Sequence, residues 1–290
     1  MQVSRRAAIL AAAGKQVFGS DELPLPAVPF GRYKISRVVV GGNPISGNSH
    51  VSPRMSSEMR DYFTTANVLK LLRDCEQAGI NTWQSRGDRH ILRLLNEHRL
   101  EGGHLQWIAQ TASELADIPA NIRSLAAEGA IGIYHHGSQT DKFWAVGKIE
   151  QAREMLKVMR DAGVQTGLGT HIPEVIDYVE SKGWDLDFYM TSLYNLSRPR
   201  AETGGELFQD SDREEMLARV RQTPRQCLIF KVYGASRKCG SPAEALEALR
   251  LVAAHAKPID CVVIGMFPKR TEQVRENCRL FREAFSARTS

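Results

Sequence analysis

From Val38 onward, short apolar runs alternate with amphipathic stretches along the chain. Each run has the length of a buried strand, and each stretch places apolar residues three or four positions apart, as on one face of a helix. In residues 149–162, for example, Leu156 and Met159 share a face, and Gly163 follows as a helix-ending residue. We expect strands in the segments 38–40, 80–84, 105–111, 130–135, 164–168, 186–190, 228–232 and 260–265.

The order of these elements predicts the fold. Parallel strands joined by crossover helices, repeated eight times in one domain, indicate a (β/α)8 barrel, that is, a TIM barrel of the α/β class. A doubly wound sheet is the alternative, but no Gly-x-Gly-x-x-Gly follows a strand, which disfavours a Rossmann site. Long loops follow strands 1 and 6, at residues 43–66 and 192–211. Because such barrels carry their chemistry in the loops after the strands, we expect these two loops to cover a pocket.

Two capping boxes predict the starts of helices. Glu214 follows Ser211 at the spacing of this motif, and Glu244 follows Ser241 with Pro242 between them. In a capping box the serine hydroxyl accepts a hydrogen bond from the backbone at the start of the helix, and proline suits the first helical position. The pattern therefore predicts helices that begin at Ser211 and at Ser241.

The N-terminal residues differ in character from the rest. Residues 4–6 (Ser-Arg-Arg) and the apolar stretch 7–14 resemble a twin-arginine export signal. The stretch is short and no A-x-A cleavage site follows it, so a short arm is the alternative. Residues 20–29 contain three prolines and predict an extended linker. We expect an arm over 1–29, a barrel domain over 30–290 and a cytoplasmic protein, with periplasmic export as the alternative.

Composition narrows the class of partner. The 290 residues include 38 Lys and Arg against 33 Asp and Glu, a formal net charge of +5, and only 7% are aromatic. The basic residues are scattered, which argues against nucleic acid as a partner, whereas a mild positive charge suits an anionic substrate or cofactor. No run of eighteen apolar residues exists, so no membrane-spanning helix is expected. We expect a small-molecule substrate and make no prediction of the oligomeric state.

Five motifs in the right order resemble the aldo/keto reductases. They cover most of residues 30–285, and the resemblance implies a barrel with an N-terminal β-hairpin and a nicotinamide cofactor. The motifs are residues 30–44 (FGRYKISRVVVGGNP), 78–83 (AGINTW), 167–176 (GLGTHIPEVI), 187–196 (DFYMTSLYNL) and 262–277 (VVIGMFPKRTEQVREN).

The catalytic positions depart from that family, whose members use an Asp, a Tyr, a Lys and a His. The Asp position falls on Gln84, the Lys position falls on Thr111, and Ser85-Arg86-Gly87-Asp88 stand where the Tyr is expected. In the family the Tyr is the proton donor and the Lys lowers its pKa, and neither Gln84 nor Thr111 can do this work. The resemblance retains the His alone, at His136, with a one-residue ambiguity that includes His135.

Three side chains are candidates for the chemistry. Adjacent residues of a strand point in opposite directions, so at most one of His135 and His136 faces the barrel axis, and we favour His136. Lys231 lies in the apolar run Ile-Phe-Lys-Val-Tyr, where a charged side chain is costly unless it reaches the barrel mouth or a partner. A desolvated Lys231 could be a base, a Schiff-base nucleophile or an anion clamp.

The resemblance also implies a site for NADP or NAD. Thr170 and His171 correspond to the pair that holds the nicotinamide carboxamide, and Tyr194 with Asn195 to the residue that stacks on the nicotinamide ring. The closing segment places a glycine after a strand, two cations and a helix start together, which is a pattern typical of phosphate binding. Its candidate residues are Gly265, Lys269, Arg270, Gln273 and Asn277.

No metal site is predicted. His136, His171, Asp141 and Glu174 could together hold a divalent ion, but no H-x-H or H-E-x-x-H spacing supports it. The five cysteines are odd in number and contain no Cys-x-x-Cys, so free thiols are expected.

Three functional hypotheses follow. The first is an aldo/keto reductase-like oxidoreductase that acts on a carbonyl or sugar-like substrate with an altered acid/base set around His136. The second is a barrel of the same ancestry without hydride transfer, a lyase, isomerase or hydrolase that uses Lys231 with His136 or His171, with or without a metal. The third is a non-catalytic cofactor-binding barrel.

Overall fold

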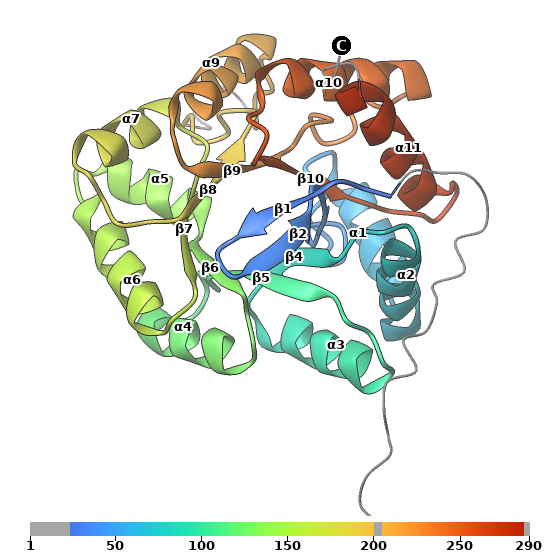
Figure 1. Ribbon diagram of the computed structural model, residues 1–290, viewed down its shortest axis with the longest axis horizontal. Coiled ribbons are helices and arrows are strands. Elements are labelled where there is room, and N and C mark those ends of the chain that lie inside the picture. The colour runs from blue at the N-terminus through green and yellow to red at the C-terminus, as the bar shows by residue number, and fades with distance from the viewer. Residues whose placement is uncertain (1–23, 200–204, 287–290) are drawn as a thin grey trace, which may run out of the picture.

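The computed structural model describes residues 24–199 and 205–286. Eight parallel strands close into a barrel in the spatial order β10-β3-β4-β5-β6-β7-β8-β9, and helices surround it (Figure 1). The predicted TIM barrel is thus confirmed. Its strands are β3 (Val38–Gly41), β4 (Thr82–Arg86), β5 (Gln106–Gln110), β6 (Gly132–His135), β7 (Gln165–Thr170), β8 (Phe188–Ser192), β9 (Gln226–Phe230) and β10 (Cys261–Gly265).

The helices begin where the sequence signals predict, with one exception. Ser241 caps α10, its hydroxyl accepting from Glu244 N, and Pro242 is the first helical residue. The other predicted cap is wrong, because α9 begins at Asp210 and Ser211 lies inside its first turn. The helices are α1 (Pro53–Tyr62), α2 (Thr65–Gln77), α3 (Arg89–Leu100), α4 (Ile118–Ala127), α5 (Gly137–Ala145), α6 (Glu150–Asp161), α7 (Pro173–Ser181), α9 (Asp210–Gln222), α10 (Pro242–His255) and α11 (Gln273–Ser286).

The exception at α9 has a physical reason. Asp212, in the first turn of the helix, is buried, and its carboxylate accepts from Asn195 N at 3.1 Å and pairs with Arg198. These contacts tie the first turn to the beginning of the preceding loop, just after β8. The anchor of the helix start is therefore a contact between distant residues, which a capping motif does not encode.

An N-terminal hairpin closes the barrel at the end where its strands begin, as the resemblance predicts. Strands β1 (Ala27–Phe30) and β2 (Tyr33–Ser36) pair antiparallel and lie across the centre of the ring (Figure 1). The hairpin begins within the segment expected to be a linker. The Phe30 ring packs edge-on against Phe188 at 5.0 Å, and a Cβ on Gly132 would lie 2.8 Å from the Phe30 ring. Phe30 thus joins the buried cluster that fills the barrel at the hairpin end.

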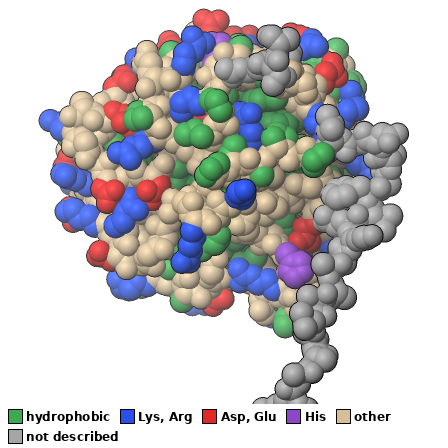
Figure 2. Space-filling view, in the orientation of Figure 1, with side chains coloured by type: hydrophobic (Ala, Val, Ile, Leu, Met, Phe, Trp, Pro, Cys, Tyr) green, Lys and Arg blue, Asp and Glu red, His purple; other side chains and the backbone are tan. Residues whose placement is uncertain are grey.

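The surface and the thiols agree with the sequence expectations. On the face seen in Figure 2, Lys and Arg side chains are scattered among Asp and Glu side chains. All five cysteines are free, and all but Cys239 are buried. Within residues 24–199 and 205–286, no helix is long and apolar enough to cross a membrane. Residues 4–14, which resemble an export signal, lie outside the described residues.

Candidate active site

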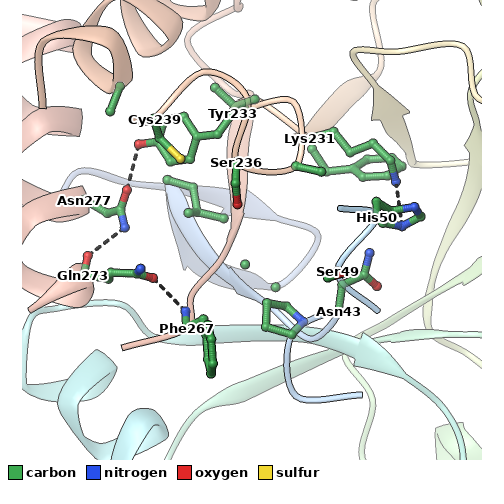
Figure 3. A pocket seen from close by; sticks show the side chains of 18 of the residues that line it. Asn43, Ser49, His50, Lys231, Tyr233, Ser236, Cys239, Phe267, Gln273 and Asn277 are labelled. Atoms are coloured by element: carbon green, nitrogen blue, oxygen red, sulfur yellow. Dashed lines mark hydrogen bonds between the residues drawn. The ribbon is translucent and has the colours of Figure 1, made fainter. Parts of the chain in front are cut away.

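A cavity of about 610 Å³ lies at the carboxyl end of the barrel strands. One end of it is lined by His50 and Lys231, and the other by Gln273 and Asn277 of α11 (Figure 3). Gln84 and Phe230 also line the cavity. The loops after β3, β9 and β10 and the helices α1, α10 and α11 form its walls. The long loop after β3, the first barrel strand, therefore covers a pocket, as predicted, and part of that loop is the helix α1. The other loop expected to cover it, after β8, places no described residue in the lining and reaches the site only through the contact of Glu206 with His50.

Lys231 meets a histidine from this loop. The Lys231 Nζ lies 3.5 Å from His50 Nε2, and His50 Nδ1 lies 2.8 Å from Glu206 Oε2 (Figure 3 shows the first contact). Because a carboxylate can only accept a hydrogen bond, Nδ1 carries the proton and Nε2 is left to accept from Lys231. Glu206, His50 and Lys231 therefore form a chain of hydrogen bonds that ends at the cavity.

The backbone is unusual at both ends of the Lys231–His50 contact. Lys231 has φ 60° and His50 has φ 54°, in the left-handed region that costs energy for residues other than glycine. Such strain persists where the surrounding structure enforces it and is concentrated at functional sites. The His50 carbonyl also accepts from Arg237 at 3.3 Å, so loops after β3, β8 and β9 converge on His50.

The surroundings of Lys231 favour its neutral form. Burial lowers the pKa of Lys231 to about 8, and the nearby carboxylates of Glu206 and Asp141 oppose this shift. Burial and the charge of Lys231 also lower the pKa of His50. Near neutral pH, Lys231 can therefore both give and take a proton, and His50 is a neutral acceptor.

A second histidine is held by a buried carboxylate. His171 Nδ1 lies 2.7 Å from Asp141 Oδ2, and the Asp141 carboxylate also accepts from the hydroxyls of Thr170 at 2.6 Å and Ser197 at 2.5 Å. The His171 ring lies edge-on to Phe230 at 5.7 Å. Because a carboxylate can only accept a hydrogen bond, His171 Nδ1 carries a proton and donates it to Asp141. The hydroxyl of Thr170 is committed to Asp141, so we find it supporting this pair.

The two adjacent histidines of the sequence separate as expected. His135 turns outward, where it bonds Thr140 Oγ1 at 2.8 Å and stacks on Phe143. His136 lies close enough to His171 and Lys231 for their charges to act on it, and burial, assisted by these charges, lowers its pKa to about 4. His136 Nδ1 is buried without a hydrogen-bond partner in the part of the chain that the structure describes. Of the two, His136 is the one that faces His171 and Lys231, but neither histidine is among the described residues that line the cavity.

The positions that replace the family's acid have structural partners. Gln84 Nε2 donates to the Tyr134 hydroxyl at 2.7 Å, and that hydroxyl donates to Gln110 Oε1 at 2.8 Å. Burial raises the pKa of Tyr134 far above its ordinary value, so this tyrosine is not a proton donor. Thr111 Oγ1 accepts from His136 N at 3.0 Å. Gln84 lines the cavity, but none of Gln84, Tyr134 and Thr111 supplies an acid.

Tyr194, which was expected to stack on the nicotinamide ring, lies outside the cavity lining. Tyr194 is buried in the outer layer against Phe208, with ring centroids 5.0 Å apart, and does not line the cavity. The chain turns after β8, where the Ser192 hydroxyl donates to the carbonyl of Tyr194 at 2.9 Å, and this turn directs the ring away from the barrel axis. Asn195 shapes the same loop, its side chain accepting from Ser197 N. Phe230 lines the cavity beside Lys231, and Tyr233 and Phe267 line it as well.

The predicted cofactor residues of segment 262–277 fall into two groups, those that line the cavity and those that do not. Gly265, Gln273 and Asn277 line the cavity, as expected of a cofactor site. Lys269 and Arg270 are absent from the described lining, and both contact Glu58 Oε1, at 2.8 Å and 3.0 Å. The expected phosphate clamp is therefore paired with a carboxylate of α1.

The side chains at the far end also shape the cavity. Gln273 Oε1 accepts from Phe267 N at 2.7 Å, and Asn277 Oδ1 accepts from the Tyr233 hydroxyl at 2.7 Å (Figure 3). These bonds fix the loops after β9 and β10 to α11.

The sequence analysis did not identify Glu206 as the partner of His50. The only sequence feature that pointed to Glu206 was its position in a long loop after a strand. Among the described residues, no group of three or more His, Cys, Asp or Glu side chains could hold a metal ion.

The chain matches no family model and no curated protein. It is similar in structure to the glycerol dehydrogenase AKR11B4 from Gluconobacter oxydans, with a TM-score of 0.55 and 14% identity over 90% of this chain and 92% of that one. It is also similar to the apo form of Gox0644, with a TM-score of 0.54 and 10% identity over 91% and 93% of the chains. The 7,8-dihydropteroate synthase from Vibrio fischeri has a TM-score of 0.51 and 12% identity over 90% and 98%. At these identities the similarity establishes a TIM barrel that has an aldo/keto reductase and other barrel enzymes among its structural neighbours.

Proposed function

We propose that the protein is an oxidoreductase that binds a nicotinamide dinucleotide in the cavity and acts on a carbonyl or hydroxyl group at the barrel mouth. The observation that carries the proposal is that one cavity joins Lys231 and Phe230 to the groove along α11. Its volume of about 610 Å³ lies within the range of small-molecule and cofactor sites. The hydrogen-bonded pair of Lys231 and His50 lies at one end of the cavity, which suits a long cofactor with one reactive end.

The lining suits such a cofactor. Phe230 presents an aromatic ring beside Lys231, which suits the flat nicotinamide. Gly41 and Gly265 are paired across β3 and β10 and both line the cavity, so the backbone can be approached closely there. When bound, the cofactor would supply or accept the hydride. The chain itself has to bind it, orient the substrate and move a proton.

Lys231 is the proposed proton donor. In carbonyl reduction its ammonium gives a proton to the substrate oxygen while negative charge develops there. His50 Nε2 accepts a hydrogen bond from Lys231, and Glu206 holds His50 in the tautomer that this requires. His171, oriented by Asp141, packs edge-on against Phe230 and so supports the wall of the cavity beside Lys231. A donor with a pKa of about 8 is well matched to reaction near neutral pH.

The test is a transfer of label. The full chain is incubated with deuterated NADH or NADPH and a panel of aldehydes, ketones and sugars, and products are examined by mass spectrometry. The proposal expects deuterium at the former carbonyl carbon of at least one product, and expects none with Lys231→Met although the cofactor still binds. Absence of dinucleotide binding to the wild-type protein would overturn the proposal.

A second candidate function rests on the same lysine. The lowered pKa of Lys231 leaves part of it as the neutral amine, which can attack a carbonyl, lose water and form an imine, as in lyases. This function requires no dinucleotide. Borohydride added with a carbonyl compound would reduce the imine, and peptide mass spectrometry would locate the adduct on Lys231. An adduct without any dinucleotide binding would favour this candidate over the oxidoreductase.

A further inference from the structure

We infer that the cavity selects NAD(H) over NADP(H), and that Glu58 on α1 enforces this choice. The inference rests on the proposed function. The two dinucleotides differ only by a phosphate on the 2′ oxygen of the adenosine ribose. Selection therefore depends on the charges at the end of the cavity where that ribose lies.

The position of the ribose follows from the reactive end. If the nicotinamide lies beside Lys231 and Phe230, the adenosine half lies at the opposite end, beside Gln273 and Glu276. Glu276 is the carboxylate of this end, and none of the described residues that line it is Lys or Arg. A carboxylate accepts hydrogen bonds from the free ribose hydroxyls of NAD, whereas a 2′-phosphate calls for a cation. The lining thus favours NAD and disfavours the added phosphate.

The neighbouring cations are already neutralised in part. Lys269 and Arg270 lie on the loop between Phe267 and Thr271, which both line the cavity, but their side chains reach Glu58. The Lys269 ammonium beside it, assisted by Arg270, lowers the pKa of Glu58. Glu58 is therefore ionised near neutral pH. To contact Lys269 and Arg270, a 2′-phosphate would have to displace Glu58 or lie close to its carboxylate, whose negative charge would repel the phosphate.

Glu58 is held over this loop by its helix. The rings of Tyr62 and Phe267 lie edge-on at 5.3 Å, and the Tyr62 hydroxyl donates to Pro268 O at 3.3 Å. Met55 and Met59, on either side of Glu58 in the sequence, line the cavity. The helix that covers the cavity is therefore the helix that brings the carboxylate to Lys269 and Arg270.

The test compares NADH with NADPH by the rise in their own fluorescence on binding to the full-length protein. Wild type should bind NADH at least about thirtyfold more tightly than NADPH. Glu58→Gln should strengthen NADPH binding about tenfold and change NADH binding by less than about twofold. Glu283→Gln is the matched control, because Glu283 is on α11 but pairs with Arg250 and Arg279. It should change neither affinity.

A double variant isolates the mechanism. Lys269→Met alone should leave NADPH binding unchanged, but in the Glu58→Gln background it should remove most of the gained affinity. The inference is overturned if wild type binds NADPH as tightly as NADH, or if Glu58→Gln does not change their ratio. Those outcomes leave the proposed function intact. Failure of both dinucleotides to bind would overturn the proposed function and this inference together.

Discussion

The two histidine–carboxylate pairs beside Lys231 are built in different ways. His171 and Asp141 join the end of β7 to α5, and their side chains are 8% and 2% exposed. His50 and Glu206 join two long loops, and their side chains are 25% and 26% exposed. The first pair belongs to the rigid framework of the barrel. The second exists only when the loops after β3 and β8 meet over the mouth, so in the proposed mechanism it links closure of the mouth to the proton donor.

The largest expected effect belongs to Lys231, which both pairs serve. Lys231→Met should reduce turnover about a thousandfold, because a positioned general acid typically contributes that much, and should leave dinucleotide affinity within about threefold. Steady-state kinetics and fluorescence titration measure the two quantities. Lys238→Met is the control, since Lys238 pairs with Asp210 on the surface. Retention of a tenth or more of the activity would show that another group is the acid.

A buried histidine outside both pairs provides a reference for acid sensitivity. Burial lowers the pKa of His135 from 6.5 to about 4, so between these values the unfolded chain binds more protons than the folded one. The free energy of unfolding should therefore fall as the pH falls through this window, by up to about 3 kcal/mol from this residue. Denaturant unfolding at pH 7 and pH 4.5 measures the change. His135→Phe, which keeps a ring against Phe143, should reduce the pH dependence, and an unchanged dependence would exclude His135 as its source.

The pairs themselves should differ in stability. Asp141→Asn leaves a buried network with mismatched donors and should lower the free energy of unfolding by about 2 kcal/mol. Glu206→Gln acts on a partly exposed loop contact and should cost less than about 0.5 kcal/mol. Urea unfolding of the two variants beside wild type gives both values. Equal losses would erase the distinction between a framework pair and a loop pair.

The smallest effect is a shift in pH dependence. Reduction should be constant at lower pH and decline as the pH rises through about 8, where Lys231 loses its proton. Because Glu206 raises the pKa of Lys231, Glu206→Gln should move this decline to lower pH by about half a unit. The dependence of kcat/KM on pH measures it. A shift to higher pH, or none, would mean that the loop pair does not act on Lys231.

Sequence reasoning found the barrel because its signals are local. The strands and the α10 cap are visible within a few residues, and the alternation of a strand was enough to separate His136 from His135. The site was harder, because its bonds join distant positions. His50 and Glu206 are 156 residues apart, and no pattern near His50 names its partner.

The cofactor residues show the same limit. Gly265, Gln273 and Asn277 follow from the end of the last strand and the start of α11, and they do line the cavity. Lys269 was predicted to bind a phosphate. Its actual partner, Glu58, lies 211 residues away along the chain, so no local pattern reveals the ion pair. Tyr194 was placed at the cofactor by its motif, but a turn after β8 directs its ring into the outer layer.

The central claim is that the cavity between Lys231 and α11 holds a nicotinamide dinucleotide. The most direct measurement is a titration of NADH into wild type and into Thr271→Trp, which fills the far end of the cavity from an exposed position. We expect saturable binding to wild type with a dissociation constant on the order of micromolar, weakened at least about tenfold by Thr271→Trp. No binding at about millimolar NADH, or equal binding to both proteins, would contradict the account.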